Sequence, residues 1–271
     1  MANLLLKPGI AGQEGVVHRV TPESAGWSYV GFEVYDLQPG QTLRRPTDGC
    51  EVCLVLVSGR AAMQAGGEDF GTLGGRASPF EGSPWSLYVP ARSDWSVTAL
   101  NGCELAVCAA PAEGSLPARV IPPEQVGEEA RGTGTNLRHV RNILPDTGMA
   151  ESLLVVEVVT PGGHWSSYPP HKHDTDDFPR ETYLEETYYH RLARGGGWAL
   201  QRVYTDDRSL DETMAVGDRD VVLVPRGYHP VGAPHGFDLY YLNVMAGPIR
   251  AWKFTVSPDH EFLGWQQGKA E

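Results

Sequence analysis

The sequence predicts an all-β protein made of two antiparallel, barrel-like domains. Eight short segments are rich in Val, Tyr and Leu and are bounded by Gly, Pro, Asp or Ser, which is the composition and punctuation of strands. These segments are 29–37, 51–59, 85–90, 103–111, 152–161, 199–205, 220–225 and 238–247. No long segment has helical periodicity with capping residues. Many short strands without intervening helices are typical of an antiparallel sandwich or barrel.

The two halves of the chain resemble each other. Each half runs through a strand, a Pro-Gly turn, a strand with a glutamate near its start, a glycine turn and a strand that ends in Val-Pro. Aligning the halves places Glu51 against Glu186. Such self-similarity predicts two related barrels. The segment 111–132, rich in proline and small polar residues, is expected to join an N-terminal domain, 1–120, to a C-terminal domain, 121–271.

Composition and charge argue against several classes of function. The 271 residues include 22 Lys plus Arg and 34 Asp plus Glu, giving a net charge of −12. The absence of a basic stripe argues against nucleic-acid binding. No apolar run reaches the roughly 18 residues that a membrane span needs, and the start lacks the features of a secretion signal. We therefore expect a cytoplasmic protein that binds neither nucleic acid nor a membrane.

The four cysteines can be interpreted in two ways. Cys50, Cys53, Cys103 and Cys108 have spacings that could supply two halves of a zinc site. However, Cys50 and Cys53 lie three residues apart on a predicted strand and would point to opposite faces. We therefore expect the cysteines to be small buried apolar residues.

Three histidines and a glutamate form a candidate metal site. His171 and His173 are one residue apart, so on a strand both imidazoles lie on one face, about 7 Å apart. Glu186 opens another strand, and His229 follows the next Val-Pro strand by a tight turn. Three imidazoles and a carboxylate can surround zinc, manganese, iron or nickel and leave positions open. His235 is the alternative fourth ligand.

The candidate ligands lie in segments that resemble a known family. Their order resembles the cupin metal-binding pattern, in which a glycine, HxH, a glutamate, a glycine turn and PxG followed by histidine succeed one another. The strings "HWSSYPPHKHD", "QRVYTDDRSLDE" and "VPRGYHPVGAPHGFDLYYLNVMAGP" resemble the 5-deoxy-glucuronate isomerase family of myo-inositol catabolism. That family is related to the 4-deoxy-L-threo-5-hexosulose-uronate ketol-isomerases. The resemblance covers essentially the whole chain and implies a bicupin with two double-stranded β-helix, jelly-roll-like barrels.

The resemblance also implies a reaction. It predicts an aldose–ketose isomerase that converts 5-deoxy-D-glucuronate to 2-deoxy-5-keto-D-gluconic acid, with a divalent ion, zinc or manganese, bound to the substrate oxygens. A metal-assisted hydride shift and a base-catalysed proton transfer both fit this reaction. The competing hypotheses are a cupin dioxygenase, in which iron would activate oxygen, and a non-catalytic cupin that binds a sugar acid.

One departure from the cupin pattern concerns the carboxylate ligand. Twelve residues separate His173 from Glu186, whereas the pattern has only a few. Glu181 or Glu185 could therefore be the ligand instead. Glu186 is preferred because the "ETYY" after it resembles the related isomerase strand, and because the alignment with Glu51 supports its register. The acidic insertion is expected to form a loop over the mouth of the site.

The chemistry requires proton transfer and a cation for the substrate carboxylate. Tyr188 and His190 share the predicted strand face of Glu186, so they are the candidates for proton handling. A guanidinium suits a carboxylate because it donates two parallel hydrogen bonds. The candidates for carboxylate binding are Arg180, Arg202, Arg226 and Lys172. Arg226 is ranked first because it lies one turn from a ligand, whereas Lys172 should face away from the metal if its segment is extended.

The N-terminal half lacks the histidine set. "TLRRPTDG" stands where HxH would be, and "VPARSDW" has no histidine after its strand. We therefore expect the N-terminal barrel to be free of metal and to have a structural or dimer-forming role. Edge strands can pair between copies, which allows a homo-oligomer.

Overall fold

The structure is a computed structural model that describes residues 3–12 and 14–264. Within these ranges it consists of antiparallel strands with one short α-helix and three 3-10 helices, which confirms the all-β prediction. Each of the eight predicted segments contains a strand, and segment 103–111 coincides with β10, Cys103–Pro111. No helix in the described ranges is long and apolar enough to cross a membrane.

The chain divides into two compact units that exchange short segments. The N-terminal unit comprises Pro8–Gly127 and Ile143–Val155, and the C-terminal unit comprises Met1–Lys7, Glu128–Asn142 and Val156–Glu271. The predicted boundary at 120/121 lies seven residues before Glu128. The sequence repeat gave no indication of the exchanged segments, because they lie outside the repeated strands.

The N-terminal unit contains two sheets with a shared apolar core. The larger has the order β11-β8-β5-β10-β3-β2, with the strands Arg119–Ile121, Ser86–Val89, Cys50–Ser58, Cys103–Pro111, Gly31–Leu37 and Val16–Val20. The smaller has the order β4-β9-β6-β7, with the strands Thr42–Pro46, Asp94–Ala99, Arg60–Ala65 and Glu68–Gly74. Alternate residues of β5, such as Leu54, belong to the same buried apolar cluster as Met63 of β6 and Trp95 of β9. The core therefore lies between the two sheets.

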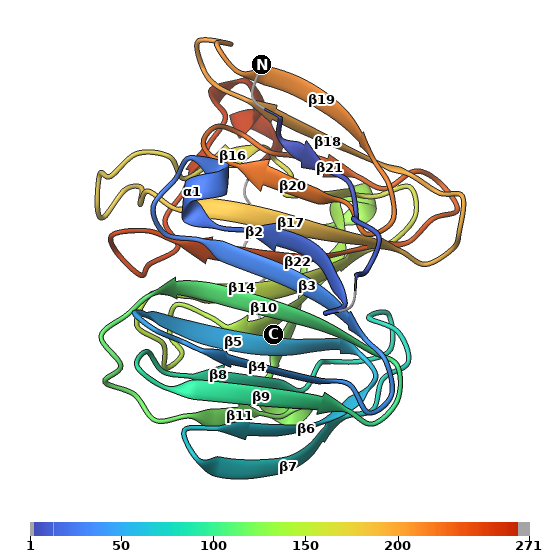
Figure 1. The fold of residues 1–271 in the computed structure, drawn as a ribbon. Helices are drawn as coiled ribbons and strands as arrows, with labels where there is room; N and C mark the ends of the chain where they lie inside the picture. Colours follow the sequence, from blue (N-terminus) through green and yellow to red (C-terminus); the bar gives the residue numbers. More distant parts are fainter. Residues whose placement is uncertain (1–2, 13, 265–271) are drawn as a thin grey trace. The chain divides into compact units, whose positions relative to one another are not determined.

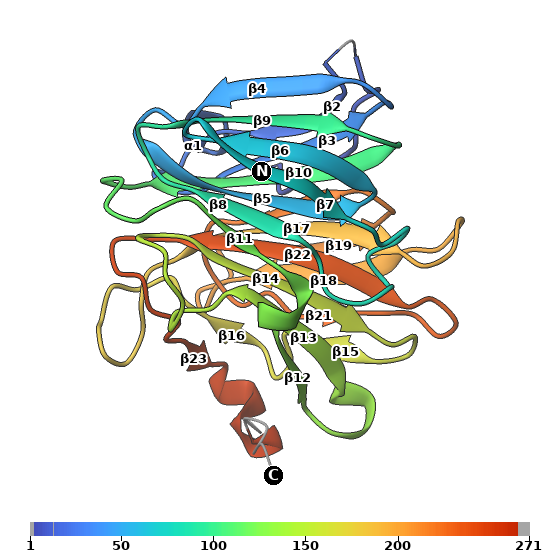
Figure 2. The same cartoon turned by 90° about the horizontal axis from the view of Figure 1, so that it is seen from below.

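The C-terminal unit is built on a seven-stranded sheet. Its order is β1-β20-β17-β22-β14-β13-β12, with the strands Leu5–Leu6, Val221–Val224, Glu185–Leu192, Leu239–Ala246, Leu154–Thr160, Arg138–Leu144 and Gly127–Arg131. A four-stranded sheet, β15-β21-β18-β19, has the strands Trp165–Ser166, Val231–Gly232, Ala199–Tyr204 and Asp211–Val216. The sheet pairs β17 with β20 and β22 on either side, as Figure 1 shows. The strands β16, His171–Lys172, and β23, Thr255–Val256, pair separately and lie side by side in Figure 2.

Helical structure is confined to short connections. The helix α1, Pro22–Ala25, has a capping box in which the Thr21 side chain accepts from Ser24 N and the Ser24 side chain accepts from Thr21 N. The 3-10 helices η1, η2 and η3 span Pro123–Gln125, Gly134–Asn136 and Pro258–Leu263.

Strand register corrects the predicted alignment of the two halves. In β5 and β8, Val52 pairs with Val89, and in β17 and β20, Glu186 pairs with Val224. Both Val89 and Val224 precede the proline of a Val-Pro strand end. Val52 therefore stands at the place of Glu186, and the predicted equivalence of Glu51 with Glu186 is wrong by one residue. Because neighbouring strand residues point to opposite faces, the N-terminal unit has no carboxylate at this inward position.

Glu51 has a structural role within the N-terminal unit. Its fully buried carboxylate accepts hydrogen bonds from Tyr88 Oη at 2.6 Å and from the backbone N–H groups of Glu151, Ser152 and Leu153 at 2.8, 2.6 and 2.6 Å. These donors satisfy the buried charge, as burial of a carboxylate requires. Glu51 thus fixes the segment 151–153 to β5.

The cysteines do not form a cluster. All four are free thiols, with Cys53, Cys103 and Cys108 buried and Cys50 half-buried. Burial raises the pKa of Cys53 to about 12, because an apolar surrounding disfavours the thiolate. Cys53, Cys103 and Cys108 are therefore packed core residues, as predicted, whereas Cys50 is only partly buried.

Candidate metal centre

Three histidines from separate segments meet inside the C-terminal unit. His171 lies in β16, His173 follows that strand, and His229 follows β20. Each residue offers a ligand nitrogen, and these nitrogens lie within 4.8 Å of one another, the one such group of three or more metal-binding side chains in the described residues. Their exposed fractions are 4%, 2% and 0%, so the cluster is buried.

Glu186 completes the cluster from β17. Its Oε2 lies 3.1 Å from His173 Nε2 and 3.2 Å from His229 Nε2, and only 3% of the residue is exposed. The structure therefore brings together the four side chains that the sequence proposes as metal ligands.

Backbone carbonyls fix the tautomers of two of these histidines. His173 Nδ1 lies 3.0 Å from Leu184 O, and His229 Nδ1 lies 2.9 Å from Gly227 O. Because a carbonyl oxygen only accepts, each Nδ1 carries a hydrogen. The Nε2 of a neutral His229 ring then presents a lone pair toward Glu186, and this buried nitrogen has no hydrogen-bond partner, so a cation would satisfy it. Since a backbone carbonyl commonly orients a metal-ligating histidine, these residues fit a divalent ion.

Burial keeps two of the rings neutral. It lowers the pKa of His171 well below its ordinary value, and the neighbouring His229 and His173 lower it further. Burial also lowers the pKa of His229 to about 4. At His173 burial is outweighed by the hydrogen bond and charge of Glu186, so the pKa is raised. Neutral imidazole is the form that ligates metals.

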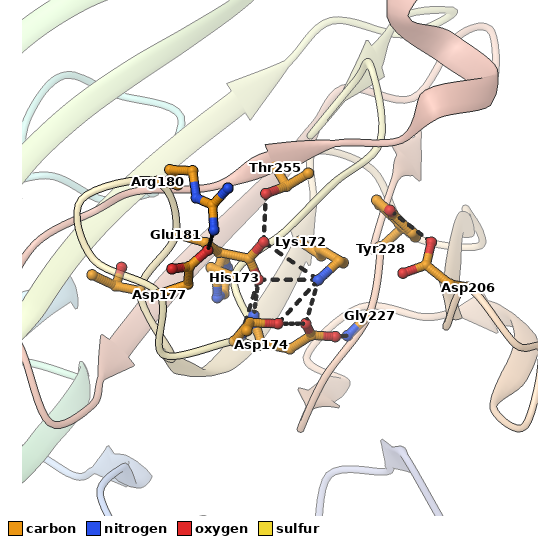
Figure 3. Close-up of polar contacts among 12 residues, drawn as sticks. Lys172, His173, Asp174, Asp177, Arg180, Glu181, Asp206, Gly227, Tyr228 and Thr255 are labelled. Carbon is orange, nitrogen blue, oxygen red and sulfur yellow. Dashed lines mark hydrogen bonds and ion pairs between the residues drawn. The ribbon is translucent and has the colours of Figure 1, made fainter.

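A glycine turn positions His229. Gly227 has a φ of +89°, and a Cβ there would lie 2.4 Å from Tyr204 O, so only glycine fits. The Gly227 N–H donates to Asp174 Oδ2 at 2.8 Å, which links this turn to the loop after His173 (Figure 3). The two segments that carry these histidines therefore support each other.

Glu181 is engaged in the loop, away from the histidines. Its carboxylate accepts from Lys172 Nζ at 3.1 Å, from Asp174 N and Thr175 N at 2.9 Å each, and from the Thr255 hydroxyl (Figure 3). These contacts organise the acidic insertion and direct Lys172 toward acidic side chains.

Two further alternatives to the proposed ligands lie outside the cluster. Glu185 precedes Glu186 on β17 and so points to the opposite face of the strand. His235 is exposed and does not belong to the cluster.

A small cavity adjoins the cluster. It measures about 30 Å³, room for about one water molecule. Its wall includes two of the candidate ligands and several polar or aromatic side chains: His171, Glu186, Tyr188, Tyr241, Arg138 and Trp252.

Two tyrosines present neutral phenols to this cavity. Tyr188 shares a 2.9 Å hydrogen bond with Ser167 Oγ, and Tyr241 shares one with Ser166 Oγ. Burial raises the pKa of both phenols, so each is a proton donor at neutral pH. Tyr240, on the other face of β22, donates to Glu157 at 2.9 Å. Of these two adjacent tyrosines, only Tyr241 is a cavity-lining residue, because neighbouring strand residues point to opposite faces.

His190 does not reach the cavity. It is fully buried, its Nε2 lies 2.8 Å from Gln201 Oε1, and it is not among the cavity-lining residues. Burial lowers the pKa of His190 to about 4. Of the two residues predicted to handle protons, only Tyr188 therefore lines the cavity.

The three arginines predicted to bind the carboxylate lie outside this cavity. The Arg180 side chain is 81% exposed and pairs with Asp177 at 2.5 Å. The Arg202 side chain is 41% exposed and pairs with Asp211 at 2.7 Å. Arg226 is exposed, and none of the three is a cavity-lining residue. These arginines were predicted to lie near the site because they are close to a ligand in the sequence. In the structure their guanidinium groups are at the surface, where water solvates the charge.

Comparison with solved structures and with family models defines the fold class and the family of this protein. A variant of oxalate decarboxylase from Bacillus subtilis superposes with a TM-score of 0.66 at 14% identity, covering 94% of this chain and 80% of that one. This likeness shows the fold, and the protein is a bicupin. A model of the KduI/IolB family matches residues 4–263, and the chain belongs to that family. The resemblance identified in the sequence is thereby confirmed.

Individual relatives match over nearly their full length. The 5-deoxy-glucuronate isomerase of Geobacillus kaustophilus is 57% identical over 264 residues, which cover 97% of this chain and 96% of that protein. The 5-deoxy-glucuronate isomerase of Bacillus subtilis strain 168 is 48% identical over 268 residues, covering 97% and 99%. A crystal structure of an IolB-like protein from Salmonella typhimurium has a TM-score of 0.94 at 53% identity, covering 97% of this chain and 99% of that one.

Proposed function

We propose that this protein is a metal-dependent aldose–ketose isomerase that converts 5-deoxy-D-glucuronate to 2-deoxy-5-keto-D-gluconic acid. The observation that carries the proposal is the buried cluster of His171, His173, His229 and Glu186 beside a cavity with neutral phenols. Full-length relatives at 57% and 48% identity bear the name 5-deoxy-glucuronate isomerase, which supports the substrate.

The ligand set supports zinc or manganese as the ion. Three imidazole nitrogens and one carboxylate oxygen suit both metals. When bound, a divalent ion supplies Lewis-acid polarisation of the substrate carbonyl and stabilises negative charge on neighbouring oxygens. The carbonyls of Leu184 and Gly227 keep the Nε2 atoms of His173 and His229 available for it.

Tyr188 is the proposed proton donor. It lies two residues after Glu186 on the same face of β17 and lines the cavity. Because burial keeps the phenol protonated, Tyr188 can donate a proton to a substrate oxygen that gains charge. Ser167 holds the phenol oxygen at 2.9 Å and can accept a hydrogen bond from it or donate one to it.

Substrate binding requires part of the cavity wall to move. The cavity of about 30 Å³ is smaller than a six-carbon sugar acid. Trp252 and Phe254 lie outside strands, with ring centroids 6.1 and 5.0 Å from that of His171. We propose that these rings move aside for the substrate and exclude water once it is bound.

The test is direct conversion. Metal-loaded protein is incubated with 5-deoxy-D-glucuronate, and product is followed by NMR while an oxygen electrode records the same sample. We expect conversion without oxygen uptake, and no conversion after chelation. Turnover by metal-free protein would contradict the role of the metal, and oxygen consumption would favour the dioxygenase hypothesis. A cytoplasmic location and a homo-oligomer stay predictions.

A further inference from the structure

We propose that Tyr241 is a second catalytic residue, which accepts a proton from the substrate hydroxyl and passes it through Ser167 to Tyr188. This inference rests on the proposed function, because it assigns a role to residues of the same site. An aldose–ketose isomerisation moves one proton between two neighbouring substrate oxygens, in addition to the hydrogen that moves between the carbons. A phenol that donates to the carbonyl oxygen must recover its proton, so another group has to collect one from the hydroxyl oxygen.

Two phenols lie next to each other in the cavity wall. Tyr188 of β17 pairs with Asn243 of β22, so Tyr241 is its diagonal neighbour on the same face of the sheet. The ring centroids of Tyr188 and Tyr241 lie 4.9 Å apart, and both rings line the cavity that also contains His171 and Glu186. Two neighbouring oxygens of one substrate can therefore contact one phenol each.

Two consecutive serines hold the phenol oxygens. The Ser167 hydroxyl lies 2.9 Å from Tyr188 Oη. The Ser166 hydroxyl forms a hydrogen bond with Tyr241 Oη. Burial raises the pKa of Tyr241, and a hydrogen bond with Ser167 opposes part of that rise, so Ser167 acts on both phenols. Because a serine hydroxyl both donates and accepts, Ser167 can take a proton from Tyr241 while it gives one to Tyr188.

The backbone at Ser167 brings both serine hydroxyls to the phenols. Ser166 ends β15, and in a continuing strand the next residue would point to the opposite face. Ser167 instead has a φ of +48°, in the left-handed region that residues with a side chain adopt at an energetic cost. The fold therefore holds a strained residue at the one place that connects the two phenols, as functional sites often do.

Burial favours transfer along connected hydroxyls. Tyr188, Tyr241, Ser166 and Ser167 are all buried. A phenolate formed among them would be a poorly solvated charge, which is unfavourable in a protein interior. If each hydroxyl gives up one proton as it receives another, no phenolate accumulates. The three hydroxyls of Tyr241, Ser167 and Tyr188 form what is called here the hydroxyl relay.

The transfer balances in atoms and electrons. The O–H bond of the substrate hydroxyl breaks and its proton goes to Tyr241, whose own proton goes to Ser167. Ser167 protonates Tyr188, and Tyr188 protonates the carbonyl oxygen. The electron pair left on the former hydroxyl oxygen forms the new carbonyl bond, and the pair of the former carbonyl bond forms the new O–H bond. The hydrogen on carbon moves by either route considered above, and all three protein hydroxyls end as they began.

The experiment removes the relay hydroxyls singly and together. Tyr241→Phe keeps the ring, and Ser167→Gly removes the serine hydroxyl at a φ that glycine adopts freely. We expect kcat to fall about 100-fold in Tyr241→Phe and about 10-fold in Ser167→Gly, where water can partly replace the hydroxyl, with KM changed less than about 3-fold. The double variant should match Tyr241→Phe, because both changes interrupt one relay. A fall of about 1000-fold, the product of the single effects, would show independent roles and overturn the relay.

A solvent isotope measurement distinguishes proton transfer from a structural role. Single-turnover rates are measured in mixtures of water and heavy water, so that the chemical step is observed. The rate of the unmodified protein should depend on the deuterium fraction along a curve, because several protons move together, and the dependence should become linear in Tyr241→Phe. A linear dependence in the unmodified protein would contradict the relay.

Controls separate this inference from the proposed function. Tyr240→Phe removes the neighbouring phenol oxygen on the other face of β22 and should keep kcat. Metal content and melting temperature show whether each variant is folded, and Ser167→Ala replaces Ser167→Gly if the latter does not fold. Full kcat in folded Tyr241→Phe would overturn its catalytic role. Failure of the proposed function would instead be visible in the unmodified protein, which would not isomerise 5-deoxy-D-glucuronate.

Discussion

The two cupin units place very different side chains at matching strand positions. In β17 the inward residues are Glu186, Tyr188 and His190, and the register with the Val-Pro strand matches them to Val52, Leu54 and Leu56 of β5. The first set is polar and contains a candidate metal ligand. The second set belongs to an apolar core cluster.

The neighbouring strand repeats the difference. Along β22 the residues paired with β17 are Met245, Asn243 and Tyr241, and along β10 the corresponding partners of β5 are Ala109, Val107 and Leu105. The same backbone pairing thus supports a polar centre in one unit and an apolar core in the other. Function depends on which side chains occupy the inward positions, since the fold alone does not define it.

The largest effect is expected from removing the candidate carboxylate ligand, which is the polar residue that the N-terminal unit lacks. We expect Glu186→Gln to lower kcat/KM at least about 1000-fold and to lose bound metal, because the ion contributes several kcal/mol to the transition state. Glu185→Gln is the matched control on the opposite face of the same strand and should keep both. Equal activity of the two variants, measured beside metal content, would exclude Glu186 as a ligand.

The apolar counterpart of Tyr188 should matter for stability alone. Leu54→Ala removes a fully buried side chain from the N-terminal core and should cost about 2–5 kcal/mol in the free energy of unfolding. Activity per folded molecule should stay unchanged. Leu100→Ala, at a residue that is 51% exposed, should cost less than about 0.5 kcal/mol. Chemical denaturation checks both, and a loss of activity in folded Leu54→Ala would contradict a purely structural N-terminal core.

Tyr188 itself should matter for catalysis. We expect Tyr188→Phe to lower kcat about 100-fold, because the variant lacks the phenol proton, while metal content stays constant. Tyr240→Phe is the matched control, since that hydroxyl bonds to Glu157 on the other face of β22. If steady-state kinetics show full activity in Tyr188→Phe, another group donates the proton.

His190 should make the protein sensitive to acid. Its folded-state pKa of about 4 lies below its ordinary value of 6.5, so the unfolded chain binds the proton more tightly. The contribution of neutral His190 to the free energy of unfolding is fully present above pH 6.5 and decreases as the pH falls toward 4. By pH 5 the loss amounts to about 2 kcal/mol. Chemical denaturation of the unmodified protein and of His190→Gln gives the difference in their free energies of unfolding, and this difference should be smaller at pH 5 than at pH 7. The same difference at both pH values would contradict a buried, neutral His190.

The sequence predicted the strands well and the positions within them less well. Strand composition located all eight segments because Val- and Tyr-rich runs between turn residues have few alternative structures. The alignment of Glu51 with Glu186 failed because a one-residue shift reverses every side chain, and a sequence repeat does not resolve one residue. Spacing identified the three histidines because the HxH pattern and the Val-Pro turn are local features.

Arg138 and Tyr241 were less accessible to sequence reasoning. Arg138 begins the segment "RHVRNIL", in which alternate residues are buried, but its approach to His171 depends on pairing between distant strands. Tyr240 and Tyr241 are adjacent, and only the register of β22 with β17 decides which one faces the cavity.

Elemental analysis of the purified protein tests the difference between the units most directly. One divalent ion per chain, lost in Glu186→Gln and retained in Glu185→Gln, is the predicted result. Two ions per chain, or one ion that survives the loss of Glu186, would contradict a single metal centre in the C-terminal unit.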